Sequence, residues 1–272
     1  MPANHPMPSL FLSHGAPDMV ITEKDARDAL RTLATRLPRP SAIVVVSAHW
    51  SADPLGVTAG DRLRTIHDFG GFPAELYALQ YPAQGSQTLS NEIKERLHEQ
   101  GFVARLDTER GLDHGAWIPL MIMYPDAEIP VVQVSLPAGS LNDLVRLGTA
   151  LRPLCQRGVL VIGSGGSVHN LRALNQVAKT DDWAVQFEHW LRQTVEGNHF
   201  SRLITTTDFP TSFRRAHPTI EHYAPLVVAW AAGDRDLPGR RVHHGFTYGN
   251  LGMSCFEFGY QTGRSNAVVP TA

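Results

Sequence analysis

Cysteine and long apolar runs are scarce in this sequence. Only Cys155 and Cys255 occur among the 272 residues, far apart in the chain, so no disulfide framework or cysteine-based zinc site is indicated. No apolar run approaches the roughly 20 residues that span a bilayer, and no secretory leader opens the chain. We therefore expect a reducing, cytoplasmic setting and no membrane partner.

Blocks of positive charge are missing as well. The formal net charge is −2, and Lys and Arg are dispersed, so nothing indicates a nucleic-acid partner or an anionic membrane surface. With 43% apolar and 18% charged residues, the chain can bury a substantial core. We expect one catalytic domain over residues 1–272 that acts on a small molecule, and the sequence carries no indication of its oligomeric state.

Histidine, in contrast, is frequent, with thirteen in the chain. Three of them follow continuous apolar runs, which are typical of strands buried on both faces. Ligands in open α/β sheets bind outside the carboxyl ends of the strands, so we expect these three histidines to lie at a common edge. The runs and their histidines are 8–12 with His14, 42–47 with His49, and 158–162 with His169.

Two glycine-rich segments also bear on the site. Residues 163–166, just before His169, lack the Lys-Ser/Thr that follows in a phosphate loop, so we interpret their glycines as room for a close approach to the site. Residues 51–85 are rich in Gly and Pro and long for a connection, which favours a functional excursion over a passive loop.

The spacing of apolar residues and the capping residues predict helices between the strands. Ser90 is expected to cap a helix that runs through Leu97, and another helix is expected to start after Ser140. Residues 182–195 form a third predicted helix, with His189 on its outer side and therefore at the surface.

A fourth histidine, His222, precedes a further predicted helix. Pro225 disfavours a regular helix across it, so this helix is expected to begin near Tyr223, with His222 at or just before its first turn. Imidazole is a common ligand of zinc and of non-haem iron, and His222 together with the three strand-end histidines indicates a mononuclear metal centre. The adjacent Glu221 is an alternative ligand, and His114 is a candidate for proton chemistry beside the metal.

Six ordered segments, each containing a histidine, span nearly the whole chain. They are Ser13-His14-Gly15-Ala16-Pro17, Val44 to Trp50, Thr65 to Pro73, Asp113 to Trp117, Val168-His169-Asn170 and Pro218 to Tyr223. Together they resemble the signature motifs of the DOPA-dioxygenase-type class III extradiol ring-cleavage dioxygenases, a family related to the catalytic subunit of protocatechuate 4,5-dioxygenase. The resemblance implies an α/β fold, a three-layer sandwich with a central mixed β-sheet flanked by helices, and one divalent metal ion at one end of the sheet.

The resemblance also implies a role for each histidine. His14 and His49 match metal ligands, and His222 stands where the protocatechuate enzymes use a glutamate. A neutral imidazole in place of a carboxylate leaves the site one charge unit more positive, so the choice between Fe(II) and Zn(II) stays open. His169 matches the family's acid/base histidine and is a candidate fourth ligand if zinc is bound. His114 matches a histidine that faces the substrate or supports the metal ligands.

The implied reaction is extradiol cleavage of a substituted, DOPA-like catechol with O2 to a muconic semialdehyde-type product. Three protein ligands on one face of an octahedron leave room for a small aromatic diol and O2, while His169 takes the second phenolic proton and later returns one. His67, in a loop rich in Gly and Phe, either stabilises that loop or faces the substrate. A zinc-dependent hydrolase and a catalytically silent binding module are the alternatives. The remaining histidines are expected outside the site: His5, His98, His199, His217, His243 and His244.

Overall fold

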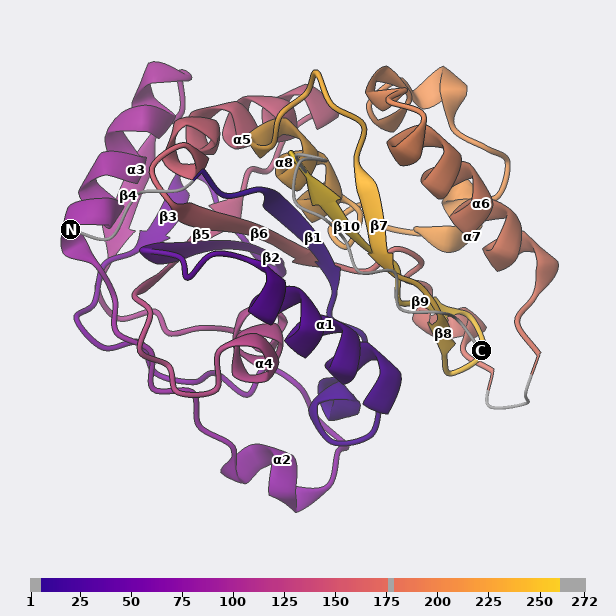
Figure 1. Cartoon of the computed structure of the whole chain (residues 1–272), viewed down its shortest axis with the longest axis horizontal. Helices are drawn as coiled ribbons and strands as arrows, with labels where there is room; N and C mark the ends of the chain where they lie inside the picture. The colour runs from indigo at the N-terminus through magenta and orange to yellow at the C-terminus, as the bar shows by residue number, and fades with distance from the viewer. Residues whose placement is uncertain (1–5, 176–178, 260–272) are drawn as a thin grey trace.

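A mixed β-sheet forms the centre of the molecule. The computed structural model describes residues 6–175 and 179–259, and within them eight strands pair in the order β4-β3-β5-β2-β6-β1-β10-β7 (Figure 1). These strands are β1 (Ser9–Ser13), β2 (Ala42–Ser51), β3 (Leu55–Thr58), β4 (Ala104–Asp107), β5 (Val131–Leu136), β6 (Val159–Gly165), β7 (Arg240–His243) and β10 (Cys255–Phe258). A small separate ribbon is formed by β8 (Phe246–Thr247) and β9 (Leu251–Gly252).

The central strands are buried on both faces, as their continuous apolar runs predicted. In β2, Ile43 and Val45 belong to the core on one side of the sheet, and Val44 and Val46 belong to the core on the other. All four side chains are almost completely buried. Because β2, β6 and β1 are parallel neighbours, their carboxyl ends meet at one edge of the sheet.

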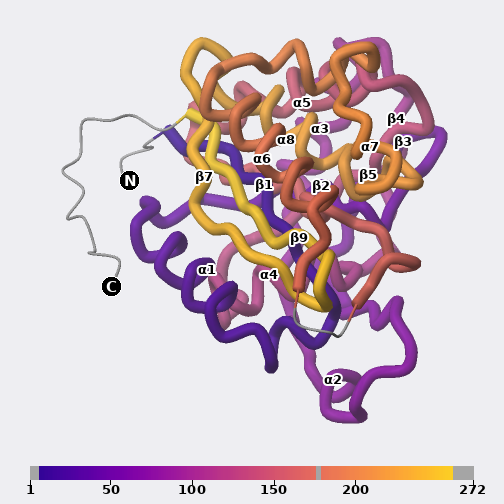
Figure 2. The backbone as a smooth tube through the Cα atoms, turned by 90° about the vertical axis from the view of Figure 1, so that its right-hand side faces the viewer, coloured from indigo at the N-terminus to yellow at the C-terminus, as the bar shows by residue number. Residues whose placement is uncertain are grey.

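Helices cover both faces, which confirms the expected three-layer α/β architecture. In Figure 1, α3 (Gln87–Glu99), α5 (Leu141–Cys155) and α8 (Ala224–Ala232) lie on one side of the sheet, and α1 (Lys24–Arg36) and α4 (His114–Met123) lie on the other. The first layer is extended by α6 (Asp182–Glu196) and α7 (Phe213–Ala216). The short α2 (Ala74–Ala78) projects from the body of the molecule (Figure 2). Single 3₁₀ turns cover Pro17–Val20, Leu171–Ala173, Phe200–Leu203 and Thr206–Asp208.

Three of the four predicted helices begin where the sequence placed them. Ser140 caps α5 in a capping box with Asp143. α6 covers the predicted range and leaves His189 exposed. α8 begins directly after Tyr223 and carries Pro225 in its first turn, where the missing amide hydrogen costs no helical hydrogen bond.

The prediction for the start of α3 is wrong. Ser86, not Ser90, caps this helix by accepting a hydrogen bond from the backbone amide of Leu89 at 3.3 Å. Ser90 is buried one turn further on, and its hydroxyl donates to the carbonyl of Thr58 at 2.6 Å. Ser90 therefore links α3 to β3, and Ser86 is the residue at which the helix begins.

Two of the predicted strands also continue beyond their expected ends. β2 runs to Ser51, so His49 lies within it, where the pairing with β5 loses its regular register between Val46 and Ser51. β6 includes residues 163–165 because they stay in register with β1. The excursion predicted for residues 51–85 is interrupted by β3, which joins the central sheet.

Three further sequence expectations concern membranes, cysteines and the first residues. Every helix in the described ranges is too short or too polar to span a bilayer. Cys155 and Cys255 are both buried and unbridged. His5 lies outside the described residues.

Candidate metal centre

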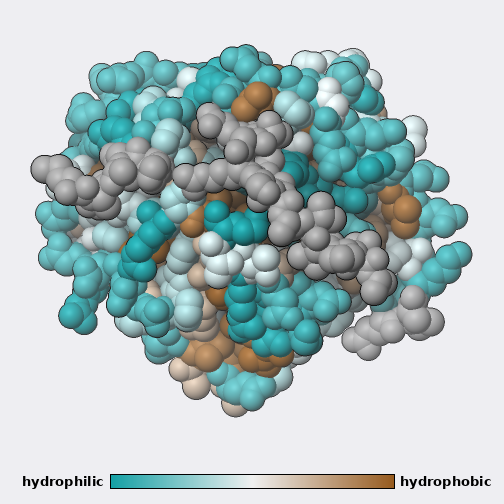
Figure 3. Space-filling model, viewed as in Figure 1, coloured by the Kyte–Doolittle hydropathy of each residue, from teal (hydrophilic) through white to brown (hydrophobic). Residues whose placement is uncertain are grey.

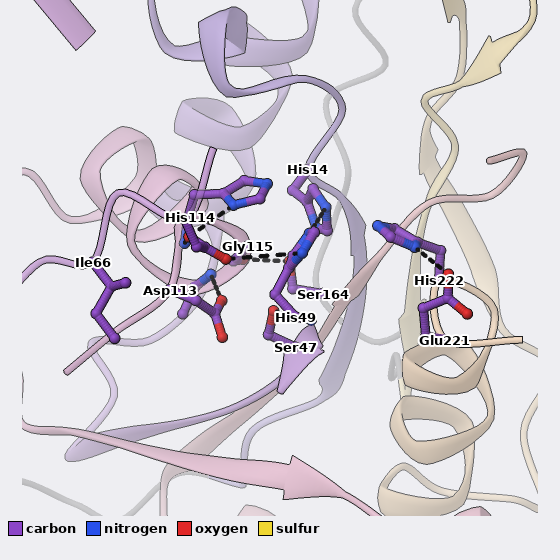
Figure 4. Close-up of polar contacts among 12 residues, drawn as sticks. His14, Ser47, His49, Ile66, Asp113, His114, Gly115, Ser164, Glu221 and His222 are labelled. Atoms are coloured by element: carbon purple, nitrogen blue, oxygen red, sulfur yellow. Dashed lines mark hydrogen bonds and ion pairs between the residues drawn. The ribbon is translucent and has the colours of Figure 1, made fainter. Parts of the chain in front are cut away.

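Three histidines converge at the edge of the sheet where β1 and β2 end. His14 directly follows β1, His49 lies near the end of β2, and His222 stands two residues before α8. Each offers a ring nitrogen, and these nitrogens all lie within 4.8 Å of one another. Figure 4 shows the three rings pointing toward one another from separate elements. The structure therefore brings together three of the four predicted metal ligands.

The environment of His14 fixes which of its nitrogens carries the proton. The buried Ser164 hydroxyl donates its one hydrogen to the carbonyl of Gly115 and lies 3.0 Å from Nδ1 of His14. Since that hydrogen is already used, the hydroxyl must accept from Nδ1, and Nε2 of His14 keeps its lone pair. Nε2 of His49 lies 3.0 Å from this atom, about the separation of two nitrogens bonded to one ion at 2.0–2.1 Å.

Glycines allow the elements of the site to approach this closely. A Cβ atom on Gly115 would lie 2.4 Å from Oγ of Ser47 and 2.9 Å from Cδ2 of His49, and one on Gly165 would lie 2.3 Å from the carbonyl oxygen of His222. The amide of the next residue, Gly166, donates to the same carbonyl at 3.0 Å. The interpretation of residues 163–166 as room for a close approach is confirmed, and the segment that approaches is the one carrying His222.

The electrostatics of the cluster suit a cation. Burial is the largest cause that lowers the pKa of His14, His49 and His222, and the neighbouring imidazoles lower it further. The three rings are therefore neutral at pH 7, as metal binding requires. Nε2 of His222 is buried without a hydrogen-bond partner in the described part of the chain, and such an orphaned nitrogen is costly unless an ion completes it. These residues fit a divalent metal ion.

Glu221, the alternative to His222, has a different environment. Its side chain is 39% exposed and lies 3.5 Å from Nδ1 of His222. Its carboxylate accepts a hydrogen bond from the hydroxyl of Thr219 at 2.6 Å. The carboxylate faces the outer side of the His222 ring and stays out of the group of converging nitrogens.

His169 lies beside the cluster, not within its group of converging nitrogens. Its ring stacks on that of His222, with centroids 3.3 Å apart and an interplanar angle of 4°. Its backbone amide donates to the carbonyl of Ala216 at 2.9 Å. Burial, followed by the charge of His222, lowers the pKa of His169 to about 3, so the ring is neutral at pH 7.

His114 is the first residue of α4 and is buried on the opposite side of the cluster. Its ring centroid lies 4.0 Å from that of His49. Asp113 caps the helix by accepting from the amide of Ala116 at 3.2 Å, and burial raises the pKa of its carboxyl group. The carboxylate of Asp68 accepts from Nδ1 of His114 at 3.0 Å. Burial, the largest single influence, raises the pKa of Asp68, but the hydrogen bonds from His114 and the charge interactions with His114 and His49 together lower it to about 2.

Two partners of the site, Asp68 and Ser164, were missed by the sequence analysis. Ser164 had no motif of its own within the glycine-rich segment. Asp68 carried one usable indication, because it is an acidic residue inside the motif from Thr65 to Pro73 and directly follows His67, and carboxylates often orient site histidines.

His67 belongs to an aromatic cluster next to His114. Its Nε2 lies 3.0 Å from the carbonyl of Leu79, and its ring contacts those of Phe69, Tyr77 and Trp117. The hydrogen bond joins the loop before α2 to Leu79, which directly follows α2, and this supports the loop-stabilising interpretation. On the face seen in Figure 3, hydrophobic residues gather at the lower edge, where the segment with α2 lies.

The other described histidines lie apart from the converging group. His98, His189, His199 and His244 are exposed, and His243 is partly buried on β7. His217 is buried, with Nε2 3.0 Å from the carbonyl of Ser167 and its ring against Phe187 and Tyr223. It is a structural residue beneath the loop that carries His169.

Comparison with known proteins gives consistent matches over nearly the whole chain. Residues 5–259 match the family described as the catalytic LigB subunit of aromatic ring-opening dioxygenase. The 4,5-DOPA dioxygenase extradiol of Portulaca grandiflora is 38% identical over 92% of this chain and 95% of its own length. The proteins of the same name from Beta vulgaris and Escherichia coli K12 are 36% and 37% identical, over 92% and 93% of this chain and 96% and 95% of their own lengths. The crystal structure of an uncharacterized protein from Escherichia coli K12 matches with a TM-score of 0.78 at 32% identity, over 93% of this chain and 100% of that chain.

Proposed function

Since this chain belongs to the family of the catalytic LigB subunit of aromatic ring-opening dioxygenases and is an extradiol ring-cleaving oxidoreductase, we propose that it opens a substituted, DOPA-like catechol with O2. The proposed product is of the muconic semialdehyde type. The convergence of His14, His49 and His222 carries the proposal. The substrate class is supported by the relatives whose names specify 4,5-DOPA. We propose further that residues 1–272 form one catalytic domain; a cytoplasmic location stays a prediction from the sequence.

In this proposal His14, His49 and His222 hold one divalent ion. Their neutral rings and the orphaned Nε2 of His222 support that assignment. An Fe(II) ion held by these three residues would supply redox chemistry between the diol and O2, whereas the filled d shell of zinc provides no such redox route.

His169 is the proposed acid/base residue. A neutral ring can accept the second phenolic proton at a ring nitrogen and return a proton as the ring opens. Its ring lies against the face of His222, one of the three proposed ligands, which supports this role. The same stacking favours this role over that of a fourth ligand, which we retain only for a zinc-filled site.

His114 and the aromatic cluster are proposed to hold the substrate. Nδ1 of His114 is engaged by Asp68, so Nε2 is the nitrogen that can hydrogen-bond the diol. The rings of Phe69, Tyr77 and His67 form a wall of tilted and edge-on aromatic contacts beside His114, which suits an aromatic ring. In this arrangement His67 contributes its ring to the wall while its Nε2 closes the loop.

The proposal is tested by metal analysis combined with oxygen-electrode assays after loading with fresh Fe(II) and ascorbate. We expect O2 uptake and a yellow semialdehyde absorbance with a catechol panel, strongest for DOPA, and neither signal with the zinc-loaded protein. His189→Ala, which removes an exposed histidine, should retain full activity. If DOPA, protocatechuate and alkyl catechols all give no signal, while the zinc form hydrolyses amides or esters, the proposed reaction is refuted in favour of the hydrolase alternative.

A further inference from the structure

One carboxylate, that of Asp68, faces two histidines of the centre at once. Its Oδ1 accepts from the backbone amide of His114 at 2.9 Å and from Nδ1 of the same residue at 3.0 Å. Its Oδ2 lies 3.9 Å from Nδ1 of His49. One carboxylate thus faces both His49, a proposed metal ligand, and His114, a proposed substrate-binding residue.

The contacts determine how both rings present their remaining nitrogens. An ionised carboxylate only accepts hydrogen bonds, so Nδ1 of His114 carries the hydrogen and Nε2 keeps its lone pair. The distance to His49 exceeds a hydrogen bond, yet the negative charge favours a proton on the Nδ1 that faces it. Nε2 of His49, which faces Nε2 of His14 at 3.0 Å, is then the atom with the free lone pair.

Asp68 is held in this position by its neighbours. Nε1 of the buried Trp117 donates to the carbonyl of Ile66 at 2.9 Å, and the ring of Phe69 packs edge-on against the ring of His114. Figure 4 places Ile66 on the same side of the centre as His114. The segment that carries Asp68 is therefore fastened to α4, and the carboxylate is not a freely moving surface group.

We propose that Asp68 is a positioning residue that sets the tautomers of both His49 and His114, and so links the metal centre to the proposed substrate-binding residue His114. Carboxylates that orient metal-ligating histidines typically change metal affinity by about 10–100-fold. The link to turnover rests on the proposed function, whereas the effects on tautomer and on metal affinity do not.

A second metal ion offers a different interpretation of the same residues. Ring nitrogens of His49 and His114 and a carboxylate oxygen of Asp68 also lie within 4.8 Å of one another. Two observations favour the positioning role. Oδ1 already accepts two hydrogen bonds from His114, and the nitrogen that His49 directs to the main cluster is Nε2, which leaves Nδ1 for the carboxylate.

The test compares the wild-type protein with Asp68→Asn, which keeps the shape of the side chain, and with Asp68→Ala. The control is Asp61→Asn, an exposed aspartate of the same excursion that accepts a hydrogen bond from Gln87. Zinc affinity is measured by chelator competition, and histidine tautomers are measured in the metal-free protein by ¹⁵N NMR.

We expect both Asp68 variants to bind zinc about 10–100-fold more weakly, while the control does not. Asp68→Ala should also lose the Nδ1-protonated signature of His114, whereas Asp68→Asn, whose amide oxygen still accepts from Nδ1, should keep it. Unchanged zinc affinity and tautomers in Asp68→Ala would overturn the proposal. So would a fall from two bound zinc ions to one, which would assign a second metal site. These readouts hold even if no catechol is turned over, so failure of the proposed function is recognised separately.

Discussion

The hydroxyl of Ser164 allows the geometry of the centre to be tested without altering any proposed ligand. In Ser164→Ala, Nδ1 of His14 loses the acceptor that lies 3.0 Å away, in a fully buried position. A buried donor left without a partner costs about 1–3 kcal/mol. Loss of a partner that orients a metal ligand typically weakens binding about 10–100-fold, which corresponds to about 1.4–2.7 kcal/mol. The first figure concerns the free energy of unfolding and the second the free energy of zinc binding, so we expect Ser164→Ala to lose stability and to bind zinc about 10–100-fold more weakly.

The matched control is Ser9→Ala. Ser9 is equally buried on β1, but its hydroxyl donates to the carbonyl of Ala229, away from the centre. Chelator competition measures zinc affinity, and urea unfolding measures the free energy of unfolding. Both variants are expected to lose stability, and only Ser164→Ala should lose zinc affinity. A Ser164→Ala protein that binds zinc as tightly as the wild type would refute the orientation of His14 by this hydroxyl.

Three further predictions follow from the same geometry. His169→Ala should retain Fe(II), but its turnover should fall by about 10²–10⁴-fold, whereas His14→Ala should lose the metal. Metal analysis and oxygen-uptake assays of both variants distinguish the two effects. Wild-type turnover in His169→Ala would exclude the acid/base role. In Gly115→Ala the new Cβ would lie 2.4 Å from Oγ of Ser47, so this variant should lose about 1–3 kcal/mol of stability and bind zinc more weakly. The control Gly70→Ala has nothing within 4 Å of its Cβ and should show neither effect. Burial lowers the pKa of His217 to about 3, against about 6.5 in the unfolded chain. The unfolded state then binds more protons, so stability falls as pH drops below about 6.5. Urea unfolding at pH 7 and pH 5 should show a smaller fall in the free energy of unfolding for His217→Gln than for the wild type. An equal fall would contradict the lowered pKa of His217.

The sequence predicted the elements whose burial is complete. Continuous apolar runs gave β1, β2 and β6, and the rule that ligands lie at the carboxyl ends of parallel strands placed His14 and His49 together. Proline geometry placed the start of α8, and with it the position of His222 just outside the helix. The family resemblance stated from six motifs is confirmed by the match over residues 5–259.

The supporting contacts could not be predicted because they join positions that are distant in the chain. Ser164 is 150 residues from His14, and Asp68 is 46 residues from His114. No local pattern encodes such pairs, since they arise only when the sheet and α4 have packed. The choice between Ser86 and Ser90 as the cap of α3 failed for a related reason, because the tertiary contact of Ser90 with β3 is invisible to helical periodicity.

The central claim is that His14, His49 and His222 bind one metal ion, and a crystal structure of the zinc-loaded protein with anomalous scattering tests it most directly. We predict a single zinc peak with one nitrogen of each of the three rings at about 2.0–2.1 Å. An ion bound elsewhere, or any one of these imidazoles farther than about 3 Å from the ion, well beyond a zinc–nitrogen bond, would contradict the account.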